Sequence, residues 1–124
     1  MGFKLKSPYD LGKLNIPIYH KKEEEGVLGR ANKNGTIVIN CDIKDEAQHD
    51  EVTAHEKVHV EQFKKFEDSN GKKGLNYTSD SVTWQGETYP RENGKIKYNG
   101  KWLIEGHKSF PWEQEAYNNE NNVT

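Results

Sequence analysis

The chain has 124 residues, of which 18 are Lys or Arg and 20 are Asp or Glu, so its formal net charge is −2. A nucleic-acid-binding domain would carry a basic excess and a disordered chain a large net charge, so the composition favours neither class. Only 31% of the residues are hydrophobic. The length therefore predicts a single domain, residues 1–124, with a thin core that a bound ligand or metal would stabilise.

The cysteine content and the hydropathy pattern indicate in which cellular compartment the protein is expected. Cys41 is the only cysteine, so no internal disulfide can form, and we expect it to be a small buried thiol. No apolar run approaches the roughly 18 residues of a membrane span, and the first residues lack the apolar stretch of a signal peptide. We expect a cytoplasmic protein without membrane or nucleic-acid partners, or a virion component if a phage encodes it.

The first third of the sequence predicts an irregular segment and then a β-hairpin. Residues 1–26 contain prolines that interrupt regular structure, with one short extended piece at residues 16–19. The dipeptide Asn34-Gly35 is a strong signal for a tight turn, and the residues that follow it are β-branched. We therefore expect a hairpin over residues 27–40.

Residues 43–68 give the clearest helix, because no Gly or Pro interrupts them. Asp42 and Asp45 stand where residues that cap a helix are expected. On a helical wheel one face gathers apolar residues together with two histidines: Val52, His55, His59, Phe63 and Phe66. The pattern predicts an amphipathic helix whose inward stripe includes both histidines.

The last third predicts a polar loop over residues 69–80, a pair of strands and a short closing helix. The strands cover residues 82–91 and 95–104, and Asn99-Gly100 would divide the second of them by another turn. Residues 109–119 suit a helix with Ser109 as its cap and Pro111 in its first turn, and residues 118–124 should fray. We expect the strand aromatics to pack across the sheet: Trp84, Tyr89, Tyr98 and Trp102.

The residues that carry chemistry are His55-Glu56-Lys57-Val58-His59. Histidines four residues apart lie one turn apart on the same helix face, so both imidazoles can reach a single Zn²⁺ ion. Glu56 flanks that face, where it can contact a metal-bound water without binding the metal. This arrangement is typical of hydrolysis in which a metal activates water and a Glu acts as general base.

This motif, followed by a helix that carries Glu115-Ala116, resembles the gluzincin group of zinc metallopeptidases, including small putative peptidases of bacteria and phages. The resemblance covers residues 36–68 and 109–119, and it implies that Glu115 is the third zinc ligand. The family has Asp four residues later, where this chain has Asn119, which can orient a histidine only without charge. Glu113 is the alternative ligand, because residues two apart lie about 200° apart around a helix and only one can face the metal.

The resemblance also implies how a peptide or protein substrate would bind. Residues 36–40 would form the edge strand before the active-site helix, and Ile37, Val38 and Ile39 would pair with an extended peptide as an added strand. A group that donates to the oxyanion is also expected, for which the candidates are His107, then Tyr89, then Tyr117.

The sequence thus predicts an α+β fold of the minimal zincin type, with a short antiparallel sheet, an active-site helix and a C-terminal closing helix. The predicted activity is peptide hydrolysis at one Zn²⁺ held by His55, His59 and Glu115, with Glu56 and His107 as catalytic residues. Iron is a chemical alternative to zinc for two His and one carboxylate. The alternative function is a non-catalytic module stabilised by zinc, in which Cys41 or the N-terminal segment fills the fourth coordination position.

Overall fold

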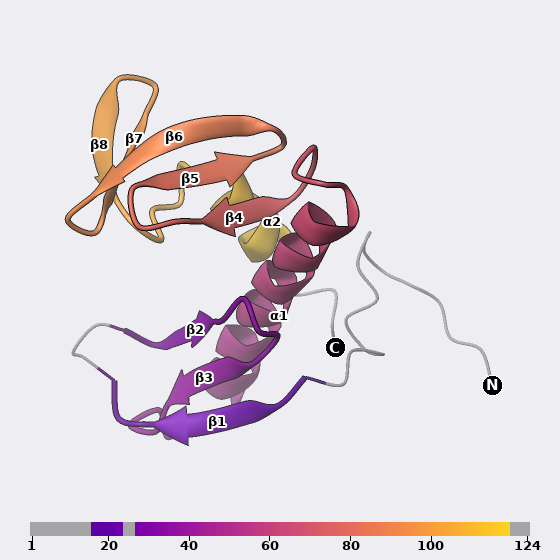
Figure 1. Ribbon diagram of the computed structural model, residues 1–124. Helices are drawn as coiled ribbons and strands as arrows, with labels where there is room; N and C mark the ends of the chain where they lie inside the picture. Colours follow the sequence, from indigo (N-terminus) through magenta and orange to yellow (C-terminus); the bar gives the residue numbers. More distant parts are fainter. Residues whose placement is uncertain (1–15, 24–26, 120–124) are drawn as a thin grey trace. The chain divides into compact units, whose positions relative to one another are not determined.

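The protein was analysed as a computed structural model that describes residues 16–23 and 27–119 (Figure 1). The expected irregularity of residues 1–15 and 24–26, the N-terminal segment as a plug, and the fraying of residues 120–124 lie outside the described part. Residues 118 and 119 were also expected to fray, but they belong to the C-terminal helix. The α+β class is confirmed. The elements in chain order are β1 (Ile18–Lys21), β2 (Gly29–Ala31), β3 (Ile37–Asn40), α1 (Glu46–Asp68), β4 (Leu75–Tyr77), β5 (Ser81–Trp84), β6 (Glu87–Glu92), β7 (Lys95–Tyr98), β8 (Lys101–Ile104) and α2 (Pro111–Asn119).

The backbone divides into two compact units, and the division falls inside both helices. The first unit comprises Met1–Glu61 and Ala116–Thr124, and the second comprises Gln62–Glu115. Each helix therefore contributes residues to both units.

The first unit contains a three-stranded sheet in the order β1-β3-β2 (Figure 1). β2 and β3 form the expected antiparallel hairpin, and Gly35 in the turn between them has φ 89°. β1 adds to the other side of β3 in parallel. The sheet is therefore mixed rather than antiparallel, and β3 is its central strand, so the expectation that residues 36–40 form an edge strand is wrong.

The core of the first unit explains why β3 lies in the middle of its sheet. Ile37 and Ile39 are fully buried and cluster with Val52 and Val60 of α1. A strand of consecutive β-branched residues that is buried on both faces is better placed between two neighbours than at an edge. Gly29 of β2 lies so close to α1 that an added Cβ would meet Val52 Cγ1 at 2.8 Å.

Helix α1 begins and ends where its flanking residues dictate. The backbone N–H of Ala47 donates to Asp45 Oδ1 at 3.1 Å, so Asp45 caps the first turn as expected. Asp42 instead pairs with Lys22 at 2.9 Å. After the helix, Asn70 and Gly71 adopt positive φ and Gly71 N–H donates to Phe66 O, which ends the helical hydrogen bonding.

The second unit contains a five-stranded antiparallel sheet in the order β4-β5-β6-β7-β8. The sequence predicts the turns after Glu92 and Tyr98, but β4 falls in the segment assigned to a loop. The turn at Gln85-Gly86, which divides the first predicted strand, was also missed. Gln85 adopts φ 50° and Gly86 φ 83°, the two successive positive values that a tight hairpin turn requires.

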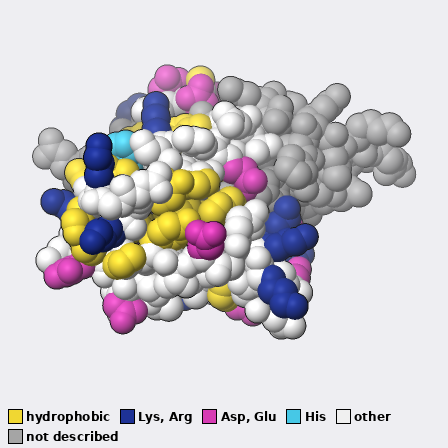
Figure 2. Space-filling view, turned by 90° about the horizontal axis from the view of Figure 1, so that it is seen from above, with side chains coloured by type: hydrophobic (Ala, Val, Ile, Leu, Met, Phe, Trp, Pro, Cys, Tyr) yellow, Lys and Arg dark blue, Asp and Glu magenta, His cyan; other side chains and the backbone are white. Residues whose placement is uncertain are grey.

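Aromatic rings form the core of the second unit. Trp112 is fully buried; it stacks on Phe110 with centroids 4.7 Å apart and contacts Trp84, Tyr89 and Tyr98. Trp102 was expected among these rings but is 43% exposed, because it lies on β8, a terminal strand of this sheet. Figure 2 shows apolar side chains gathered on the surface of the face seen from above.

The composition led us to expect no membrane-spanning helix and a buried Cys41. Within the described residues, neither helix is both long and apolar enough to cross a bilayer. Cys41, by contrast, is exposed rather than buried. It follows the last residue of β3 and its backbone N–H donates to Lys21 O, so the side chain lies at the end of the sheet and not in the core.

Candidate metal centre

Helix α1 brings His55 and His59 together as their spacing predicts. Their Nε2 atoms lie 3.3 Å apart, and their rings meet edge to face with centroids 4.9 Å apart. Two nitrogens that bind one tetrahedral Zn²⁺ at 2.0–2.1 Å should lie about 3.3–3.4 Å apart. The pair is therefore already spaced as two ligands of a single ion would be.

Helix α2 supplies the carboxylate. Pro111 occupies the first helical position, as expected, and the buried Trp112 anchors the first turn in the aromatic core. This fixes the next residue, Glu113, with its side chain turned inward and only 5% exposed. The cap expected at Ser109 moves by one residue, because the carbonyl of Phe110 accepts from Glu113 N–H and Gln114 N–H.

The residues brought together are His55, His59 and Glu113. One ligand atom from each lies within 4.8 Å of the others, so the group could hold a metal ion, the identity of which the geometry leaves open. The carboxylate in this group belongs to Glu113, the alternative, and not to Glu115, which the resemblance implied. The donor set of two imidazoles and one carboxylate suits zinc, and also iron.

A hydrogen bond explains what Glu115 does instead. Gln62 lies on α1 one turn after His59 and is fully buried. Its Nε2 donates to Glu115 Oε1 at 2.9 Å and to the backbone oxygen of Trp112 at 3.0 Å. Since Glu113 and Glu115 project in different directions from α2, the residue that faces Gln62 leaves the other to face the histidines.

Two of the three ligand residues are shielded from solvent. Glu113 is buried and His59 is 7% exposed, and a buried carboxylate is found in proteins either paired or bound to a metal. Burial raises the pKa of the Tyr77 hydroxyl, and the negative charge of Glu113 raises it further, while Arg91 acts in the opposite direction. Tyr77 thus stays a neutral phenol within the electrostatic reach of the Glu113 carboxylate.

Of the other predicted site residues, Glu56 and Tyr117 lie next to His55, whereas His107 and Tyr89 make contacts with other residues. Glu56 follows His55 on α1 and is half-buried. The ring of Tyr117 lies 4.4 Å from that of His55. His107 is exposed in the loop before α2, where its Nδ1 accepts from Ser109 N–H at 3.0 Å. Tyr89 packs against Tyr98 with centroids 5.3 Å apart.

The predicted substrate-binding residues and the predicted positioning residue are buried. Ile37, Val38 and Ile39 lie on the central strand with both of its edges paired, so they cannot add a peptide strand. Asn119 is also buried at the end of α2. The assignment of residues 37–39 to substrate binding is therefore wrong, because the parallel addition of β1 occupies the edge that this role requires.

Sequence reasoning missed Gln62. A signal was present, since Gln62 lies three positions after His59 and therefore on the same side of the helix as this histidine. Two of the groups that accept hydrogen bonds from Gln62 are the carbonyl of Trp112 and the carboxylate of Glu115. They lie 50 and 53 residues away in the sequence, so the local pattern does not reveal them. Comparison with known proteins adds no relative: no family model, no curated protein and no solved structure matches the chain.

Proposed function

We propose that the protein is a zinc-dependent metallopeptidase, with His55, His59 and Glu113 as the metal ligands. The observation that carries the proposal is the grouping of the three ligand atoms within 4.8 Å of one another. A further glutamate, Glu56, directly follows His55 on α1. Two His and one Glu leave a coordination position for water, which distinguishes catalytic zinc sites from closed structural ones. A bound zinc ion would lower the pKa of that water and polarise the substrate carbonyl.

Glu56 is the general base in this proposal. It accepts a proton from the attacking water and then delivers it to the nitrogen of the leaving amine, so that one carboxylate serves both proton transfers. Its half-buried position beside His55 supports this role. Glu56 and both histidines lie within one uninterrupted α-helix, so the helical backbone fixes the position of the base relative to the ligands.

Tyr117 replaces His107 as the proposed donor to the developing oxyanion. The 4.4 Å contact between the rings of Tyr117 and His55 supports this choice. His107 already accepts a hydrogen bond from its own loop. A phenol hydroxyl can donate to the oxyanion in its neutral form, and such donors stabilise the transition state of peptide hydrolysis.

The proposed substrate is an extended peptide that pairs with β2. This strand is a terminal strand of its sheet, and it packs through Gly29 against Val52, one turn before His55 on α1. A peptide that adds to such an edge gains backbone hydrogen bonds and is aligned by the strand. Leu28, which precedes the strand, and Arg30, within it, are exposed and would contact substrate side chains.

The experiment is a comparison of Glu56→Gln with wild type on a library of fluorogenic peptides in the presence of Zn²⁺. Glu56→Gln should bind zinc normally and lower kcat/KM by about 10² to 10⁴, the usual contribution of a general base. Glu51→Gln, an exposed glutamate on the same helix, is the matched control and should leave the activity unchanged. Full activity in Glu56→Gln would remove Glu56 from the base role, and a zinc-loaded wild type that cleaves nothing in the library would favour a structural zinc module.

A further inference from the structure

Four of the five histidines form two pairs, and the second pair lies outside the site described above. His20 Nε2 and His49 Nε2 are 2.8 Å apart, and the two rings stack with centroids 5.0 Å apart at 16°. His20 belongs to β1 and His49 to the beginning of α1, so the pair joins two elements that are 29 residues apart in sequence. Both residues belong to the first unit.

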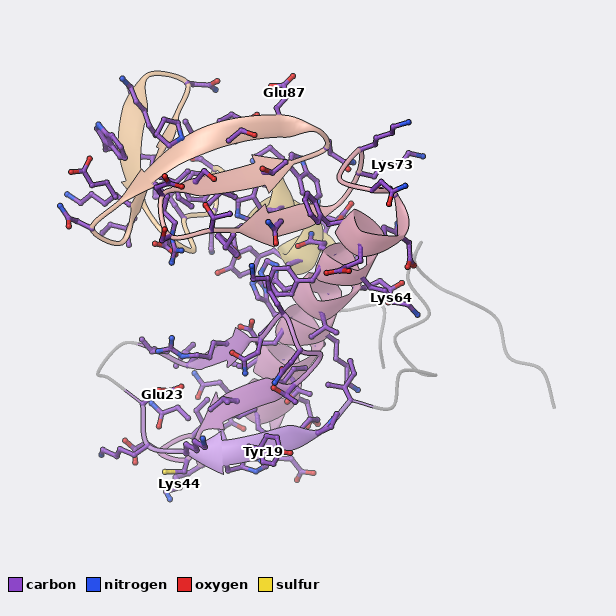
Figure 3. All side chains as sticks on the ribbon, viewed as in Figure 1. Tyr19, Glu23, Lys44, Lys64, Lys73 and Glu87 are labelled. Carbon is purple, nitrogen blue, oxygen red and sulfur yellow. The ribbon has the colours of Figure 1, made fainter. Side chains whose placement is uncertain are left out.

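The register of the sheet explains why His20 faces the helix. β1 runs parallel to β3 with Ile18 opposite Ile37 and His20 opposite Ile39. Residues opposite one another in a parallel pair share a face of the sheet, and Ile37 and Ile39 point into the core beneath α1. His20 therefore lies on the same face of the sheet as Ile39, at the rim, where its side chain is exposed. Its neighbour Tyr19, labelled in Figure 3, is 50% exposed.

The surroundings of His49 suit a metal-ligating histidine. Its Nδ1 faces Asp50 Oδ1 at 3.4 Å, and a carboxylate on this nitrogen favours the tautomer in which Nε2 carries the free lone pair. Thr53 Oγ1 donates to the carbonyl of His49 at 2.8 Å, which adds to the helical hydrogen bonding around the residue. The ring thus presents Nε2 toward His20 from an ordered helix.

We propose that His20 and His49 form a second metal site, which takes a divalent transition-metal ion such as Zn²⁺ through the two Nε2 atoms, with water completing the coordination. The nitrogens would need to separate by about 0.5 Å to reach the spacing of two ligands on a tetrahedral ion. His20 is exposed, so its side chain can make this adjustment. Imidazole is a favoured ligand for zinc, copper and nickel ions.

This second site is independent of the candidate metal centre. His49 and His55 are six residues apart on α1, which separates them by about 9 Å along the helix axis, so one ion cannot use both. An ion bound by both histidines would cross-link β1 to α1, because His20 belongs to the strand and His49 to the helix. Because the ion binds only when both residues are in their folded positions, it stabilises the sheet of the first unit.

The test is a calorimetric titration of the metal-free full-length chain with Zn²⁺ alone. Wild type should bind two ions, and His20→Gln should bind one. His55→Gln/His59→Gln should keep one ion, which adding His20→Gln to this variant should remove. The matched control is His107→Gln, since His107 is an exposed histidine without a second histidine at its Nε2; its stoichiometry should equal that of wild type.

The outcomes separate this inference from the proposed function. If wild type binds one ion and His20→Gln removes it, the second site stands and the candidate centre fails. If the stoichiometry is unchanged in both His20→Gln and His49→Gln, the inference is overturned and the pair is a hydrogen bond only. Circular dichroism checks that each variant folds. Amide exchange of β1 gives a second readout: zinc should slow exchange there in wild type and not in His20→Gln.

Discussion

The substitution Glu113→Gln tests the candidate metal centre most directly. Glu113 is a buried carboxylate, and Gln keeps its shape while removing its charge. In the presence of zinc the variant should lose the stabilisation that the third ligand provides, because a neutral amide is a weaker ligand than a carboxylate. A loss of the zinc-dependent part of the stability, measured against the same variant without metal, is the signature of a ligand.

The magnitude follows from linkage. A ligand that binds only the folded state stabilises it by about 2.7 kcal/mol when its free concentration is 100 times the Kd. If Glu113→Gln weakens binding about 100-fold, the same zinc concentration gives only about 0.4 kcal/mol. For a chain of 124 residues, about 4 °C of Tm corresponds to each kcal/mol, so the zinc-dependent shift should fall from about 10 °C to about 2 °C.

The assay is thermal unfolding of each protein with chelator and with zinc. It is run in the His20→Gln background, so that only one site contributes. Glu115→Gln is the matched control: it changes the neighbouring glutamate of α2, and an amide oxygen can still accept from Gln62. The control should keep the full zinc-dependent shift. A shift that is lost in Glu115→Gln and kept in Glu113→Gln would refute the assignment and return the ligand role to Glu115.

Two further predictions concern the second unit. Gly74→Ala should lower the free energy of unfolding by roughly 2–5 kcal/mol, because the added Cβ would overlap the backbone O of Gln62 and the backbone N of Phe66. The control Gly94→Ala has a similar positive φ but open space around the added Cβ, so it should cost about 1–2 kcal/mol. Equal losses of stability in urea unfolding would show that the positive φ alone, and not the overlap, causes the effect. Tyr77 has a raised pKa in the folded state, so the unfolded chain loses this proton first and stability should fall as the pH rises above about 10, by at most about 1.4 kcal/mol per pH unit. Tyr77→Phe should flatten that slope in urea titrations between pH 9 and 11, and an unchanged slope would contradict the role of Tyr77.

Local patterns predict the parts of this protein whose structure is local. The hairpin turn at Asn34-Gly35, the cap at Asp45 and the position of Pro111 at the start of α2 follow from backbone preferences of single residues. The shared face of His55 and His59 follows from helix geometry alone, because residues four apart lie one turn apart in any α-helix. None of these features depends on what packs against the segment.

Other features depend on partners that are distant in sequence. Strand β3 became central because β1 adds to it in parallel, and a one-dimensional pattern of β-branched residues cannot say how many neighbours a strand has. Trp102 is as aromatic as Trp84 but lies on a terminal strand and is exposed. Both errors concern the position of a strand within its sheet, which is a property of the assembled sheet.

The sequence by itself determined that two histidines and a following glutamate share one helix, and that a glutamate from the closing helix could complete a metal site. Only the tertiary structure decided which glutamate is grouped with the histidines. Glu113 and Glu115 are both placed on α2 by the same local preferences, and the partly buried hydrogen bond from Gln62 to Glu115 distinguishes them. Helix periodicity gives the angle between two side chains, but only a packed neighbour fixes the rotation of the helix and hence which side chain faces the site.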